Sequence, residues 1–164
     1  MSYNFRYADK NNVKEILPLL FSILHSNMSV IAPTGNSYED DYKIWLSNIV
    51  PAMEKDARQI VLMFCGDELA GYFQYYVNTV SSSLMMEEIQ IREKYQGTGL
   101  FSGFYRWLVS KLPKDIKFVE AYSHKNNCKS QNILEHLGLI KTGENSSLFY
   151  YKGSYNSLLK RYHK

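Results

Sequence analysis

The chain has 164 residues, of which 45% are hydrophobic and 21% charged, and its formal net charge at pH 7 is +3. A globular chain of this length buries about 70 % of its unfolded surface, and this balance of residues excludes an intrinsically disordered protein. The Lys and Arg residues are scattered rather than gathered in one block, so nucleic-acid binding is not expected. We predict a single domain over residues 1–164.

The cysteines and the apolar runs indicate where the protein works. Cys65 and Cys128 lie far apart and show no metal-ligand spacing, which is typical of proteins in a reducing cytosol. No stretch approaches the about 18 apolar residues that a membrane-spanning helix needs, and the first residues lack the pattern of a secretion signal. The sequence therefore predicts a soluble, cytoplasmic protein with no membrane partner and no bound metal.

Hydrophobic periodicity predicts the elements of the first half of the chain. In chain order they are a strand at 3–7, helices at 13–24 and 38–53, and strands at 59–65 and 69–78. Because only a short turn around Gly66 separates the last two strands, they are expected to form an antiparallel hairpin.

The second half continues the alternation. In chain order it contains a strand at 84–91, a helix at 100–112, a strand at 117–123, a helix at 128–137, strands at 140–143 and 148–152, and a short helix at 155–162. Pro113 and Gly138 mark the ends of the two longer helices. This order predicts an α/β fold with one strand-helix-strand crossover in the middle.

Two glycines stand between the predicted strand at 84–91 and the predicted helix at 100–112. At such a junction, backbone N–H groups and the positive end of the helix dipole converge, and Gly97 and Gly99 would let a phosphate approach the backbone. A dinucleotide-binding loop would need a third glycine, and a Walker loop would need a Lys after the glycines. The junction predicts an anion site of another kind.

Two motifs identify a family. The segment Gln96-Gly97-Thr98-Gly99-Leu100-Phe101 resembles the coenzyme motif Gln/Arg-x-x-Gly-x-Gly/Ala of the GNAT superfamily of acetyl-CoA-dependent N-acetyltransferases, and Ile89-Gln90-Ile91 matches the apolar-x-apolar pair that precedes it. Asn127, Ser130 and the step Leu137-Gly138-Leu139 resemble a second motif of the family. The predicted order of elements is also that of the family, so the resemblance covers almost the whole chain.

The resemblance implies a GNAT-like mixed, mostly antiparallel sheet of about seven strands. Helices would cover both faces, and the fourth and fifth strands would splay apart near a β-bulge at Ile91. It also implies acetyl-CoA as cosubstrate, without a metal, and direct attack by a primary amine in a ternary complex.

The resemblance further implies which residues bind the coenzyme. Backbone groups around Ile89 and Ile91 would pair with the pantetheine arm, N–H groups from Gly97 to Ser102 would hold the pyrophosphate, and Asn127 would reach the arm from the other side. The full expected set is Ile89, Gln90, Ile91, Gln96, Gly97, Thr98, Gly99, Leu100, Phe101, Ser102, Asn127 and Ser130.

Two positions depart from the family pattern. Phe101 stands where the coenzyme motif has Gly or Ala, so the packing of the pyrophosphate there is open to change. Leu134 stands where many members carry a Tyr that protonates the departing thiolate. Either another tyrosine does this work, with the candidates Tyr105, Tyr122, Tyr150 and Tyr151, or the thiolate leaves unaided. Because thiol pKa values lie near ~8.5, we expect the second route.

Glu87 and Glu88 on the predicted strand at 84–91 are the candidate catalytic residues. An amine with a pKa of about 10 arrives protonated, so a carboxylate, or a water that it orders, must remove a proton before attack. Adjacent strand residues point to opposite faces, so the two carboxylates cannot face the substrate equally, and Glu87 is slightly favoured. The alternative is that either glutamate faces solvent or pairs with a Lys.

The acceptor cannot be read directly from the sequence. If the aromatic residues Tyr38, Tyr42, Trp45, Tyr75 and Tyr76 lined the acceptor side, the carboxylates beside them would suit a small cationic amine or a lysine or N-terminal amine of a peptide. His124 and His136 are expected to be structural or surface residues, and a covalent route through Cys128 is less favoured than direct attack. The alternatives to an enzyme are a non-catalytic acetyl-CoA-binding sensor or interaction domain and an unrelated nucleotide-binding protein. The chain is expected to be a monomer or a homodimer.

Overall fold

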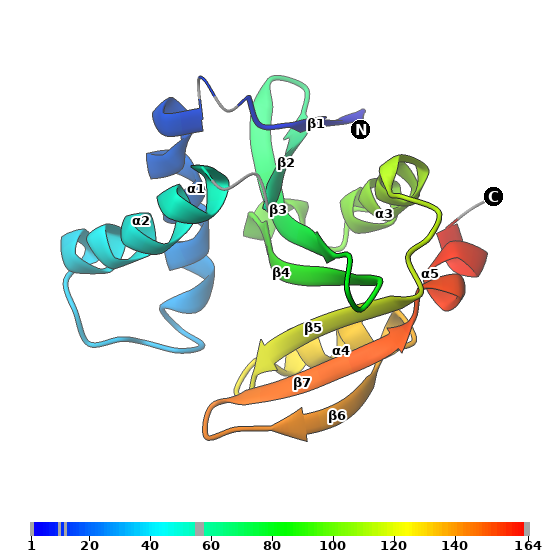
Figure 1. Cartoon of the computed structure of the whole chain (residues 1–164). Helices are drawn as coiled ribbons and strands as arrows, with labels where there is room; N and C mark the ends of the chain where they lie inside the picture. Colours follow the sequence, from blue (N-terminus) through cyan, green and yellow to red (C-terminus); the bar gives the residue numbers. More distant parts are fainter. Residues whose placement is uncertain (1, 10, 12, 55–57, 163–164) are drawn as a thin grey trace. The chain divides into compact units, whose positions relative to one another are not determined.

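The computed structural model describes residues 2–9, 11, 13–54 and 58–162 (Figure 1). Its strands form one seven-stranded sheet in the order β1-β2-β3-β4-β5-β7-β6. Strands β4 and β5 are parallel, and the other neighbouring strands are antiparallel. The predicted α/β class and the mixed, mostly antiparallel sheet are confirmed.

The elements agree with the sequence periodicity to within a few residues. In chain order they are β1 (Tyr3–Tyr7), α1 (Val13–Met28), α2 (Tyr38–Glu54), β2 (Gln59–Cys65), β3 (Glu68–Asn78), β4 (Ser83–Ile91), η1 (Glu93–Tyr95), α3 (Leu100–Lys111), β5 (Phe118–His124), α4 (Cys128–His136), β6 (Ile140–Glu144), β7 (Leu148–Ser154) and α5 (Tyr155–Tyr162). The one addition is η1, a single 3₁₀ turn that follows β4.

The chain divides into two compact units. Unit 1 consists of Met1–Gln74 and Glu88–Gln96, and unit 2 consists of Tyr75–Glu87 and Gly97–Lys164. Strands β3 and β4 each contribute residues to both units. The predicted single domain over residues 1–164 therefore stays a prediction, and so does the splaying of β4 and β5.

The core of unit 1 is formed by α1 and α2 with β2 and β3. Helical spacing places the apolar residues of α1 on one side, and the alternation of β2 places every second residue beside them. The buried cluster consists of Val13, Leu17, Leu20, Ile23, Ile49, Ile60, Leu62, Leu69 and Tyr72. The last turn of α1 and the end of β4 belong to this same unit.

Unit 2 is built on the ladder between β5 and β7, with β6 at the outer edge. Residues Ser83–Met86 of β4 pair in parallel with Phe118–Ala121 of β5. Helices α3 and α5 pack together through the buried rings of Tyr105 and Tyr162, whose centroids are 5.4 Å apart. Trp107 stacks on Phe104 along α3, with 6.4 Å between the ring centroids.

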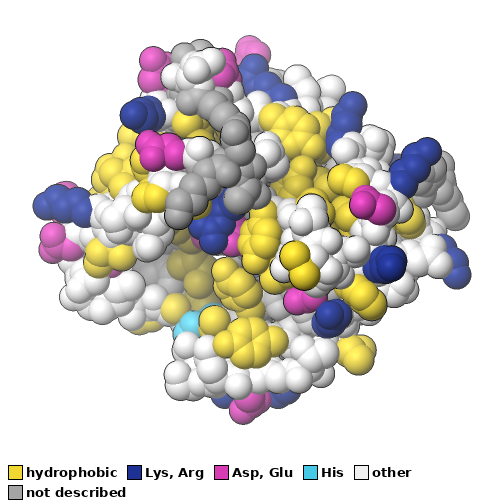
Figure 2. All heavy atoms as spheres, in the orientation of Figure 1, with side chains coloured by type: hydrophobic (Ala, Val, Ile, Leu, Met, Phe, Trp, Pro, Cys, Tyr) yellow, Lys and Arg dark blue, Asp and Glu magenta, His cyan; other side chains and the backbone are white. Residues whose placement is uncertain are grey.

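Within the described ranges, no helix is both long enough and apolar enough to cross a membrane. Among the same residues, no three or more His, Cys, Asp or Glu side chains gather as they would around a metal ion. On the face shown in Figure 2, Lys and Arg side chains are interspersed with acidic and apolar ones, as the scattered charges of the sequence indicate.

Candidate active site

The N-terminus of α3 presents an uncapped helix end in unit 2. Gly99 is the N-cap, with φ of 88°, and no side chain caps the helix. The first turn closes with the bond from the Gly103 N–H to the Gly99 carbonyl at 3.1 Å, so the N–H groups of Leu100, Phe101 and Ser102 have no carbonyl partner within the helix. This end of the helix has the donors and the dipole orientation that an anion requires.

The two glycines leave space in front of these donors. Gly97 also has a left-handed backbone, with φ of 76°, and both glycines and Thr98 between them are exposed. A Cβ atom added at either glycine would have no heavy-atom neighbour within 4 Å, apart from the adjoining chain. The residues present therefore fit a pyrophosphate, because it can approach the backbone without meeting a side chain.

Phe101 lies in the first turn of α3, where its ring is half-buried. The ring packs on Tyr105, with 4.6 Å between the centroids, and Tyr105 itself is 1% exposed. Because Phe101 packs against a buried ring of its own helix, this departure from the coenzyme motif contributes to packing within unit 2.

The turn that leads from β4 to the glycines is anchored to the start of β3, within unit 1. The Arg92 N–H donates to the Ala70 carbonyl at 2.9 Å, and the Arg92 Nε donates to the Leu69 carbonyl at 2.8 Å. Lys94 Nζ and Tyr95 Oη both donate to Glu68 Oε2, at 2.7 Å and 2.8 Å. These two hydrogen bonds, that of Lys94 first, hold the pKa of Glu68 below its ordinary value of 4.5.

At the end of β4, two side chains bind one backbone carbonyl. The Ile91 oxygen accepts from Gln96 Nε2 at 2.8 Å and from Asn27 Nδ2 at 3.1 Å. Asn27 Nδ2 also donates to Gln90 Oε1 at 2.9 Å. The structure thus brings Gln90, Ile91 and Gln96 together, and their role in coenzyme binding stays a prediction. Asn27 of α1 was not predicted, because no local pattern links residues 63 positions apart.

The two candidate carboxylates are both half-buried but differ in their surroundings. Tyr72 of β3 donates a hydrogen bond from its Oη to Glu88 Oε1, within unit 1, whereas Glu87 belongs to unit 2. Tyr72 is 0% exposed, and this burial, followed by the charge of Glu88 and the hydrogen bond to it, raises the pKa of the phenol well above 10. The structure therefore gives Glu88 a defined partner that the sequence did not reveal.

Asn127 and Ser130 of the second motif form the cap of α4. Asn127 is the N-cap, and its Oδ1 accepts from the Ser130 N–H at 3.0 Å. Because the oxygen is used in this cap, the Nδ2 group is the part of the Asn127 side chain that is suited to donate to a ligand.

Comparison with known proteins identifies the fold. No protein-family model matches the sequence, and no curated protein matches it. The structure is similar to an acetyltransferase from Thermus thermophilus, with a TM-score of 0.74, 18% identity and coverage of 94% of this chain and 97% of that one. The chain has the fold of the GNAT acetyltransferases.

Two further GNAT-like structures contain coenzyme A. One is the PaiA N-acetyltransferase from Thermoplasma acidophilum in complex with coenzyme A, with a TM-score of 0.68, 14% identity and coverage of 94% of this chain and 100% of that one. The other is the spermidine N-acetyltransferase from Vibrio cholerae in complex with CoA and spermine, with a TM-score of 0.66, 13% identity and coverage of 96% and 98%. At these identities the likeness establishes the GNAT fold, while the site residues stay predictions.

The four tyrosines considered as candidate proton donors fall into two groups. Tyr105 donates to the Met86 sulfur at 3.2 Å, and burial raises its pKa well above the ordinary value. Tyr151 is also buried, which raises its pKa. Tyr122 and Tyr150 are exposed and lie opposite each other on β5 and β7.

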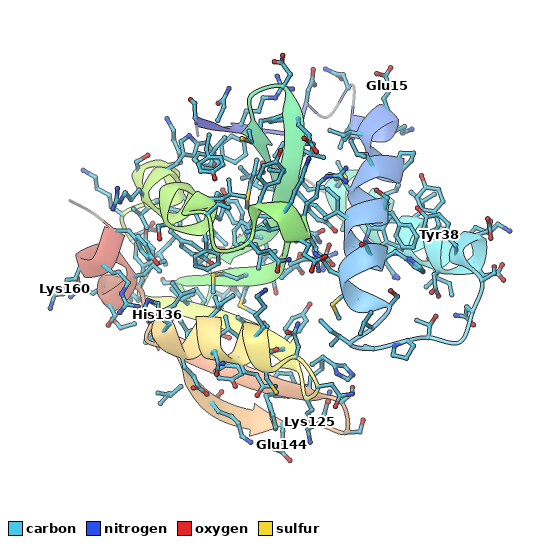
Figure 3. All side chains as sticks on the ribbon, turned by 180° about the vertical axis from the view of Figure 1, so that it is seen from behind. Glu15, Tyr38, Lys125, His136, Glu144 and Lys160 are labelled. Atoms are coloured by element: carbon cyan, nitrogen blue, oxygen red, sulfur yellow. The ribbon has the colours of Figure 1, made fainter. Side chains whose placement is uncertain are left out.

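The remaining polar candidates lie at the surface or in local contacts. His124 is half-buried, and its Nδ1 accepts from the Asn126 N–H at 3.2 Å, which is a local structural bond. His136 is exposed in the last turn of α4 (Figure 3). Cys128 is an exposed free thiol at the first residue of α4.

Three of the aromatic residues considered for the acceptor side pack together within unit 1. The rings of Tyr38, Tyr42 and Trp45 surround Phe21 of α1, with centroid distances of 5.0 Å, 5.1 Å and 5.5 Å. They thereby join α2 to α1, and Tyr38 stays partly exposed at the end of this cluster (Figure 3).

Proposed function

We propose that this chain is an acetyl-CoA-dependent N-acetyltransferase that acts on a primary amine. The observation that carries the proposal is the uncapped N-terminus of α3, preceded by two left-handed glycines with open space beside them, at the motif position in a GNAT fold. Such an end binds phosphate groups through backbone N–H donors and the helix dipole. The coenzyme A in the Thermoplasma and Vibrio structures supports the same ligand here.

Each motif would contribute one part of the coenzyme site. The N–H groups from Gly97 to Ser102 hold the pyrophosphate, the backbone of β4 around Ile89 and Ile91 binds the pantetheine arm, and the Nδ2 group of Asn127 donates to the arm. The bound coenzyme supplies the acetyl thioester.

Glu88 is the preferred general base. Its carboxylate takes a proton from the ammonium group of the acceptor, directly or through an ordered water, and the neutral amine then attacks the thioester carbonyl carbon. A C–N bond forms and the C–S bond breaks. Coenzyme A leaves as the thiolate, because Leu134 has no proton to give, and the new amide nitrogen releases its second proton to water. Glu87 adds a second negative charge, and Tyr72 holds one oxygen of Glu88.

The acceptor that suits this site is a cationic amine. Two adjacent carboxylates, Glu87 and Glu88, attract a positively charged substrate, and the Vibrio relative of similar fold was solved with spermine. A small polyamine-like amine is therefore our first candidate, before a lysine or N-terminal amine of a peptide. We place the reaction in the cytoplasm, where the free thiols of Cys65 and Cys128 stay reduced.

A second candidate function is a sensor that binds acetyl-CoA without turnover. Leu134 favours it, because this buried residue replaces a family proton donor. The two candidates share the coenzyme and differ in catalysis.

A thermal-shift titration with acetyl-CoA tests the proposal, with ATP and NAD as controls. A ligand present at 100 times its dissociation constant adds about 2.7 kcal/mol of stability. We expect stabilisation by acetyl-CoA alone, followed by release of free thiol when cationic amines are added. No shift at millimolar acetyl-CoA would refute coenzyme binding, whereas stabilisation without thiol release on any amine would establish the sensor.

A further inference from the structure

The carbonyl of Ile91 is fully occupied by side chains of unit 1. A carbonyl oxygen has two lone pairs, and here one accepts from Asn27 Nδ2 and the other from Gln96 Nε2. A third donor could bind this oxygen only by displacing one of the two. Both acceptor positions of the last carbonyl of β4 are therefore used by hydrogen bonds within the protein.

The same contacts fix the residue before it. Gln90 is only 8% exposed, and a buried amide needs a partner, which Asn27 provides at its Oε1 atom. On the neighbouring strand, Gly71 lies so close that any Cβ atom there would clash with the Gln90 carbonyl oxygen. The end of β4 is thus held by the backbone of β3 and by a side chain of α1.

The contacts continue along the turn toward the glycines. The residue after Ile91 pairs with β3 through the bond from the Arg92 N–H to the Ala70 carbonyl, and the Gln96 side chain folds back over five residues to Ile91. Gln96 is the last residue before Gly97. The two donors, Asn27 and Gln96, therefore set where the strand ends and where the chain begins its path to α3.

We propose that Asn27 and Gln96 are positioning residues for the coenzyme, and that Ile91 gives its carbonyl to this internal anchor. This role rests on the proposed acetyl-CoA site. The pantetheine amide then binds the other acceptor on the same edge of β4, the Ile89 carbonyl, because alternate strand residues present their carbonyls to the same side. The Gln96 amide then serves the anchor instead of the pyrophosphate.

The test uses Asn27→Leu and Gln96→Leu, which remove the donors at similar volume. Two quantities are measured: the dissociation constant for acetyl-CoA by calorimetry, and amide hydrogen exchange over residues 88–97 in the free protein. We expect the dissociation constant for acetyl-CoA to be about tenfold larger in each variant. We also expect faster amide hydrogen exchange at Arg92, whose N–H pairs with β3. Asn27→Gln, which keeps the donor, should recover part of the affinity.

Asn48→Leu is the matched control. Asn48 Nδ2 donates to the Ile44 carbonyl at 3.0 Å on the exposed side of α2, so its loss removes the same kind of bond far from β4 in sequence. This variant should bind acetyl-CoA as the wild type does and should leave exchange over residues 88–97 unchanged.

These measurements distinguish a failure of the positioning role of Asn27 and Gln96 from a failure of the proposed function. If the wild type does not bind acetyl-CoA, the proposed function fails, and only the exchange data then bear on the anchor. If the wild type binds and both Leu variants bind equally well, the positioning role is overturned. Tighter binding by Asn27→Leu would also overturn it, because Ile91 would then be a coenzyme acceptor that Asn27 blocks. Should Asn27→Leu fail to fold, Gln96→Leu tests the same oxygen.

Discussion

The phenol of Tyr72 donates its hydrogen bond to the carboxylate of Glu88, so a buried residue of β3 fixes a half-buried acid on β4. A carboxylate oxygen that accepts from a rigid, buried donor loses rotational freedom, and the group is oriented before any substrate binds. This contact orients Glu88 for the role of general base, for which the sequence slightly favoured Glu87.

Replacing the carboxylates separates catalysis from coenzyme binding. Glu88→Gln should lower turnover on the true amine by more than tenfold, because the amide cannot remove a proton, while the dissociation constant for acetyl-CoA stays within about twofold. Glu87→Gln should show a smaller loss. Steady-state kinetics with calorimetry measure both quantities, and unchanged turnover in both variants would exclude the carboxylates from the mechanism.

Tyr72→Phe should cost about 2 kcal/mol of unfolding free energy at pH 8, because the ring is kept and one hydrogen bond to a charged group is lost. The folded pKa of Tyr72 is raised well above 10, its value when exposed, so the contribution of the phenol is complete below pH 10 and is lost as the pH rises above it. Urea denaturation at pH 8 and pH 10.5 should show the gap between wild type and variant closing at the higher pH. A constant gap would mean that the phenol ionises equally in both states.

Gly99→Ala and Gly66→Ala form a matched pair. Both glycines have positive φ and no heavy atom near an added Cβ, but Gly66 lies in the turn between β2 and β3. Each Ala should cost about 1 to 2 kcal/mol of stability from left-handed strain. Only Gly99→Ala should weaken acetyl-CoA binding, by tenfold or more, because its methyl group stands where the pyrophosphate approaches. Equal affinities would place the coenzyme elsewhere.

Phe101→Ala restores a small residue of the family motif. Because the ring packs on buried Tyr105, we expect the variant to lose about 2 kcal/mol of stability and to change the affinity for acetyl-CoA by less than threefold. Chemical denaturation and calorimetry give the two values. A tenfold gain in affinity would instead identify Phe101 as an obstruction at the coenzyme site.

The hydrogen bonds from Lys94 and Tyr95 to Glu68 should weaken in acid. Its folded pKa is lowered, so its contribution to stability is present above 4.5, the ordinary value, and is lost as the pH falls through the lower folded value. The difference in thermal melting between wild type and Glu68→Gln at pH 7 should therefore shrink as the pH falls below 4.5. A difference that does not change with pH would show that the carboxylate charge is not what binds Lys94 and Tyr95.

The order of elements could be predicted because the helices and strands carry their own periodicity and several of them are bounded by Gly, Pro or Asn. The turn η1 escaped prediction, since three residues are too few to show a period. For the same reason, the expected β-bulge at Ile91 rests on the family resemblance alone.

The candidate site was predictable only where its residues are close in the chain. Gln96 to Ser102 form one local motif, and Asn127 with Ser130 form a cap whose spacing is visible in the sequence. The contacts of Tyr72 with Glu88 and of Asn27 with Gln90 join residues 16 and 63 positions apart, and such pairs exist only once the strands and α1 are assembled. The tertiary fold, rather than local pattern, determines them.

Each unit contains one of the two tryptophans of the chain, Trp45 in unit 1 and Trp107 in unit 2. Both indoles pack on a phenylalanine of their own unit, Trp45 on Phe21 and Trp107 on Phe104. When one tryptophan is replaced by Phe, the fluorescence of the remaining tryptophan reports the unfolding of its own unit alone. If both tryptophans report the same melting temperature, the two units unfold in one cooperative transition. If the melting temperatures differ, the units unfold separately although they share strands β3 and β4.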